Sequence, residues 1–138
     1  MNRASRTLGA ILAGAFGMVF VLATYAGEPK YTELLLSDVK DGTAKQVFAP
    51  TTPKIFLSTK LVDVPKGAKL KAAWIAEKTK VAPPNYQIDS TELDVGSLMN
   101  RATFSMSKPN AGWPPGDYRV DLAINGKLLN TVRFKVAP

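Results

Sequence analysis

The sequence contains no cysteine and no histidine among its 138 residues. Histidine is the commonest general base, and cysteine and histidine together are the usual ligands of zinc and other transition metals. Their absence excludes Ser-His and Cys-His catalytic pairs, metal sites built on these ligands, and disulfide bonds within the chain. A folded domain in this chain must therefore be stabilised by its hydrophobic core alone.

The sequence also offers no phosphate-binding loop and no carboxylate cluster that would suggest catalysis or metal binding. Several glycines stand singly in turns without P-loop spacing: Gly42, Gly67, Gly96 and Gly116. Asp89, Glu92 and Asp94 lie close in sequence, but strand alternation separates Asp89 from the other two and predicts a solvated edge rather than a calcium or catalytic site. We therefore predict no catalytic residue, no cofactor and no metal, and we expect that the protein is not an enzyme.

The N-terminal segment is apolar and preceded by positive charge. Arg3 and Arg6 come before an uncharged run, Thr7 to Gly27, which as a helix would span roughly 30 Å, enough to cross a bilayer. Ala26, with Thr24 two residues before it, is an acceptable cleavage site. Two interpretations of residues 1–27 stay open: a cleaved signal peptide, or an uncleaved transmembrane helix. Both export residues 28–138 to the periplasm or to the extracytoplasmic face of the inner membrane, soluble or anchored.

A stripe of small residues runs through the apolar segment. Gly9, Ala13 and Gly17 recur every fourth residue and would share one face of a helix. Such a stripe lets a second transmembrane helix approach closely, so these residues are candidates for helix packing within a membrane complex. Alanine and glycine are also common in signal peptides, which is the alternative explanation.

Residues 28–138 show short alternating runs separated by turn residues, and no helical periodicity, which predicts an all-β domain. Asn125-Gly126 between two alternating runs predicts a hairpin with a type I′ turn. Trp74 shares one strand face with other apolar residues and is a core candidate. The expected strands are Tyr31–Ser37, Ala44–Phe48, Ile55–Val62, Lys69–Glu77, Tyr86–Leu93, Arg101–Ser107, Asp117–Ile124 and Leu128–Val136.

The segment Gly112–Val120 resembles the entry to the penultimate strand of immunoglobulin-like and fibronectin-III-like modules in exported bacterial proteins. Tyr118 then takes the place of the tyrosine corner, Trp74 that of the core tryptophan, and Val120 that of an antibody cysteine. The resemblance covers Phe48 to Val136. It implies an immunoglobulin-like antiparallel β-sandwich of about 7–8 strands, preceded by the one N-terminal hydrophobic helix.

Two surface features are candidates for recognition. Lys69 and Lys71 belong to a lysine-rich stretch, residues 60–80, that could contact anionic lipid or an acidic partner, although a solvated face is the plainer interpretation. Nucleic acid is not expected, because stacking aromatics are lacking between these charges. Trp113 precedes two prolines and is a candidate interface residue. The alternative is that Trp113 folds back and caps the end of the sandwich.

Two functional classes follow from these observations. In the first, the chain is a membrane-tethered accessory subunit that binds protein partners, including transmembrane helices of a larger complex. In the second, the chain is a soluble periplasmic or secreted binding module, adhesive or chaperone-like, which signal-peptide cleavage releases. The identity of the partner, the stoichiometry and any ligand are not encoded in a recognisable motif.

Overall fold

A computed structural model describes residues 27–138, which form eight β-strands. Each strand overlaps one of the eight segments expected from the alternation, so the all-β prediction is confirmed. The strands are β1 (Lys30–Ser37), β2 (Val47–Phe48), β3 (Lys54–Val62), β4 (Lys69–Thr79), β5 (Tyr86–Asp94), β6 (Arg101–Ser107), β7 (Gly116–Ile124) and β8 (Lys127–Val136).

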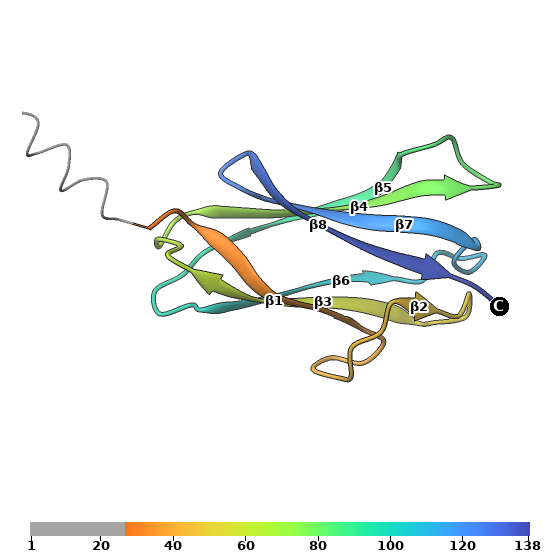
Figure 1. Ribbon diagram of the computed structural model, residues 1–138, viewed down its shortest axis with the longest axis horizontal. Coiled ribbons are helices and arrows are strands. Elements are labelled where there is room, and N and C mark those ends of the chain that lie inside the picture. The colour runs from red at the N-terminus through yellow and green to blue at the C-terminus, as the bar shows by residue number, and fades with distance from the viewer. Residues whose placement is uncertain (1–26) are drawn as a thin grey trace, which may run out of the picture.

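The strands form two sheets that pack face to face (Figure 1). The smaller sheet has the order β1-β3-β6, and the larger has the order β2-β8-β7-β4-β5. All pairs are antiparallel except β2 and β8, which run parallel. The chain therefore starts in the smaller sheet and changes to the larger one at β2.

Several predictions concern residues that the structure does not describe. The N-terminal hydrophobic helix, the nature of domain 1–27 and the stripe of Gly9, Ala13 and Gly17 lie outside the described residues, apart from Gly27 itself. Within residues 27–138, no helix is long and apolar enough to cross a membrane.

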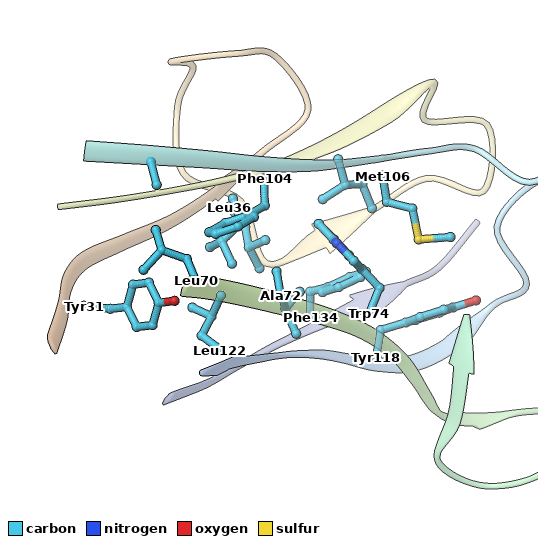
Figure 2. Close-up of a cluster of buried hydrophobic side chains, with 14 of the residues drawn as sticks. Tyr31, Leu36, Leu70, Ala72, Trp74, Phe104, Met106, Tyr118, Leu122 and Phe134 are labelled. Carbon is cyan, nitrogen blue, oxygen red and sulfur yellow. The ribbon is translucent and has the colours of Figure 1, made fainter. Parts of the chain in front are cut away.

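The hydrophobic core lies between the two sheets and is built mainly from alternate strand residues (Figure 2), whereas β5 contributes only the partly buried Ile88 and Leu93. Trp74 is buried on the inner face of β4, and Tyr118 and Phe134 lie on the same face of this sheet, on β7 and β8. The Tyr118 and Phe134 rings stack with centroids 5.2 Å apart, and Trp74 meets Phe134 edge-on at 6.3 Å. Phe48 and Trp113 complete an aromatic cluster in one half of the sandwich.

The two ends of the sandwich carry different loops, as Figure 1 shows. The end next to Gly27, here called the proximal end, carries the β3–β4, β5–β6 and β7–β8 loops. The opposite, distal end carries the β2–β3, β4–β5 and β6–β7 loops and the C-terminus. The aromatic half of the core adjoins the distal end, because the Trp113 loop lies there.

Candidate interaction groove

The β6–β7 loop folds inward at the distal end. Gly112 has φ 89°, a left-handed conformation that turns the chain back toward the core. The Trp113 backbone N–H donates to the Pro50 carbonyl at 2.9 Å, and the indole Nε1–H donates to the Thr52 carbonyl at 2.9 Å. The Trp113 side chain is only 1 % exposed. The ring of Trp113 therefore folds back and caps the end of the sandwich, which was the alternative interpretation, and a role for Trp113 in an interface stays a prediction.

Tyr118 fixes the other side of this loop. Its hydroxyl donates to the Pro114 carbonyl at 2.5 Å, four residues upstream, which is the arrangement of a tyrosine corner. Burial raises the pKa of Tyr118 to about 12. The rings of Trp113 and Tyr118 meet edge-on with centroids 5.9 Å apart. Trp113 and Tyr118 thus hold the loop in place, and their rings form the floor of a groove at this end of the sandwich.

An apolar groove of about 380 Å³ opens above this floor, between the β4–β5 and β6–β7 loops. Val81 and Tyr86 are its exposed large hydrophobic residues, at 72 % and 51 % of their surface. No charged residue lines the groove. The lining residues are Ala76, Thr79, Val81, Ala82, Pro83, Tyr86, Ile88, Pro109, Trp113, Pro114 and Tyr118.

The β4–β5 turn holds the outer wall of the groove in place. Asn85 has φ 58°, its N–H donates to the Glu77 carbonyl at 3.0 Å, and its side-chain oxygen accepts from Arg119 Nη1 at 2.7 Å. Pro83 and Pro84 stiffen the same turn. Sequence reasoning missed this groove, although an apolar turn without charge, Val81 to Pro84, directly before Tyr86, was its signal.

The lysine-rich stretch does not gather on one surface. Lys60 lies on β3 of the smaller sheet, whereas Lys69 and Lys71 lie exposed on the outer face of β4. Lys69 Nζ is 3.0 Å from Asp94 Oδ1, and this contact raises the pKa of Lys69. Lys71 is paired in register with Glu92 on β5. That Lys69 and Lys71 contact an anionic partner stays a prediction, and their acidic neighbours offset much of the local charge.

The rest of the outer face of the larger sheet is occupied by ion pairs. Arg119 lies 3.5 Å from Glu77 and 3.2 Å from Asp121, and Arg133 also reaches Glu77 at 3.2 Å. A wider hollow of about 650 Å³ lies here, but charged side chains in its lining already bind one another. This face is consequently a weaker candidate for binding than the apolar groove.

The acidic residues of β5 lie along an edge strand of the larger sheet. Asp89, Glu92 and Asp94 are all exposed, and Asp89 stands in register with inward-facing Trp74. Within the part of the chain that the structure describes, no three acidic side chains lie close enough to hold a metal ion.

No family model matches the chain, and no curated protein matches it. Among solved structures, an immunoglobulin-like protein from Pseudomonas aeruginosa is similar, with a TM-score of 0.53 and 13% identity over 80% of this chain and 93% of that one. The fold is an immunoglobulin-like β-sandwich. The predicted resemblance is thereby confirmed at the level of architecture, with β4 carrying the core tryptophan and β7 the tyrosine corner.

Two solved enzymes contain a similar sandwich. An alkylpurine DNA glycosylase from Pseudomonas fluorescens bound to DNA has a TM-score of 0.51 and 18% identity over 81% of this chain. A β-glucosidase from Listeria innocua in complex with gluconolactone has a TM-score of 0.51 and 10% identity over 80% of this chain. The chain spans only 31% of the glycosylase and 16% of the β-glucosidase.

These neighbours overturn one prediction. The expectation that the protein is not an enzyme, which was drawn from the absence of catalytic residue types, is contradicted, because similar sandwiches occur within an alkylpurine DNA glycosylase and a β-glucosidase. At 10% and 18% identity the likeness shows the fold alone, and a shared fold leaves function to be argued from the site.

Proposed function

We propose that the protein is an exported interaction subunit, which its N-terminal hydrophobic segment tethers to the outer side of a membrane and which binds a protein partner through the distal groove. The observation that carries this proposal is the groove itself. It combines exposed apolar side chains, Val81 and Tyr86, with a rigid floor that holds no charge.

A groove of this composition suits an apolar anchor side chain of another protein. Burial of apolar surface is the main favourable term in protein association, and aromatic residues are enriched where binding energy concentrates. The prolines and the hydrogen-bonded loops reduce the entropy lost on binding, because the walls are already ordered. The groove therefore offers a preformed site to its partner.

The position of the groove agrees with a tether. Gly27 lies at the proximal end, and the groove lies at the distal end. A chain anchored through residues 1–27 would hold the groove away from the lipid, toward extracytoplasmic parts of a membrane complex. The stripe of Gly9, Ala13 and Gly17 would contribute a second contact, to a transmembrane helix of that complex.

A photocrosslinking amino acid placed at Tyr86 tests the groove in living cells. Leu128 on β8 provides a matched control, since it is 58 % exposed against 51 % for Tyr86 and does not line the groove. We expect one discrete protein adduct from position 86 that Val81→Glu abolishes, and none from position 128. Equal crosslinking from both positions, or none from position 86, would refute the groove as the binding site.

A further inference from the structure

The proximal end is a rigid surface, because backbone hydrogen bonds connect its loops. Gly67 N–H donates to the Val95 carbonyl at 2.8 Å, and Val95 N–H donates to the Ala68 carbonyl at 2.9 Å. These bonds join the β3–β4 and β5–β6 loops. Leu61 N–H also donates to the Asn100 carbonyl at 2.8 Å. The β5–β6 loop is thus held at both of its ends.

Leu98 lies in this β5–β6 loop, and both its exposure and its backbone conformation are unusual for a leucine. Its side chain is fully exposed, at 101 % of its reference surface, which is the largest value among the exposed apolar residues described. Its backbone has φ 63°, a left-handed conformation that asparagine and glycine adopt more readily than leucine. A leucine at position 98 is favoured neither by the backbone conformation there nor by packing against other described residues.

The chain enters the sandwich at the same end, through a very short connection. Gly27 lies against Asp63 in the β3–β4 loop, and Glu28 and Pro29 border the β7–β8 hairpin. Strand β1 begins at Lys30, so only Glu28 and Pro29 separate it from the apolar run that ends at Gly27. The three steps along the chain from Gly27 to Lys30 span at most about 10 Å when extended. A bilayer crossed by the apolar run would therefore lie within about 10 Å of the proximal loops.

We infer that the proximal end rests on the lipid surface and that Leu98 inserts between the headgroups. This inference depends on the proposed tether. Lys66 and Lys127 are exposed at this end, but so are Glu28 and Asp63. With charges of both signs present, the contact rests on the apolar side chain of Leu98 rather than on attraction to anionic lipid. The occupant of this surface is the bilayer in which the chain's own N-terminal segment is anchored.

The absence of cysteine makes a direct test simple, because one introduced cysteine is the only thiol in the chain. The full chain with Leu98→Cys carries an environment-sensitive fluorophore and is reconstituted into phosphatidylcholine vesicles. Val39→Cys is the matched control, since Val39 is an exposed apolar residue in the turn that follows the distal end of β1. Flotation of the vesicles reports the tether, and the fluorophore reports the contact with lipid.

We expect the protein to float with the vesicles, with the label at position 98 shifted to the blue and quenched by spin-labelled lipids. The label at position 39 should keep the emission it has in water. Flotation with water-like emission at both positions would overturn the lipid contact and leave the tether intact. A chain that does not float would overturn the tether and, with it, the lipid contact.

Discussion

Trp74 lies in the aromatic half of the core, where β4, β7 and β8 face the smaller sheet. Its indole packs edge-on against Phe134, and its side chain is almost completely buried. The indole Nε1–H has no hydrogen-bond partner among the described residues. Packing, rather than hydrogen bonding, therefore accounts for what Trp74 contributes to stability.

Removal of this side chain should be costly. We expect Trp74→Ala to lower the free energy of unfolding by about 3–5 kcal/mol, through lost burial and the cavity left behind. Urea titration measures the loss, and Leu128→Ala at the surface should change stability by less than about 0.5 kcal/mol. A change at Trp74 as small as that of the control would show that the core is not packed around this residue.

Tyr31 and Tyr118 should make the fold sensitive to alkaline pH. Burial raises the pKa of each hydroxyl from 10.0 to about 12. The folded state thus keeps its protons where the unfolded state loses them, so stability is complete below pH 10 and falls as the pH rises from about 10 to about 12. Tyr118→Phe should reduce this fall while it removes the bond to Pro114, measured as melting temperature against pH. An equal decline in both proteins would contradict the assignment to Tyr118.

At the level of elements, the β7–β8 hairpin shows how a turn sequence sets register. Asn125 has φ 50° and Gly126 has φ 83°, and Ile124 pairs with Lys127 across the two-residue loop. Positive φ at both central residues is the type I′ turn that Asn-Gly predicts. The Asn125 side chain also accepts from the Lys69 N–H at 2.9 Å, which attaches the hairpin to β4.

Gly126→Val should destabilise the protein through backbone strain alone. A Cβ at Gly126 would meet no atom within 4 Å, but the left-handed conformation costs a side chain about 1–2 kcal/mol. Gly96→Val is the matched control, because Gly96 also faces open space and does not have a φ in the left-handed region. Chemical denaturation should show a loss only at Gly126. Equal losses at both glycines would mean that strain at positive φ is not the cause.

The sequence predicted the strands well because alternation is a local property. On β8, Phe134 and Val136 are buried and Thr131, Arg133 and Lys135 are exposed, as the period of two requires. A bulge in β1 was not predicted: Glu33 has φ 50°, and the pairing with β3 shifts between Thr32 and Leu35. Alternation alone does not encode such a shift, which depends on the partner strand.

The loops were harder to predict, because their packing depends on contacts distant in sequence. The direction of Trp113 is set by φ at Gly112 and by an acceptor on Thr52, 61 residues away. The groove likewise needs the β4–β5 and β6–β7 loops side by side, which follows from the strand order and not from either loop. The aromatic and proline residues of these loops suggested an interface, but they did not show that Tyr86 would be exposed and Trp113 buried.

On the scale of the whole molecule, the two features on which the proposed function depends lie at opposite ends. The proximal end receives the chain from the apolar segment and carries Leu98, whereas the distal end carries the groove around Tyr86. Between the two ends, ion pairs occupy much of the outer face of the larger sheet. The proposed tether at one end and the proposed binding site at the other require only that the sandwich stay rigid between them.

The central claim is that residues 1–27 remain attached as an anchor, and the intact mass of the native protein from its own cells tests this most directly. We predict that the protein is in the membrane fraction and that its mass still includes the apolar segment of residues 1–27. Cleavage after Ala26 would instead give a soluble chain that begins at Gly27. That result would contradict the tether and the lipid contact, and would leave a secreted module that binds its partner through the groove.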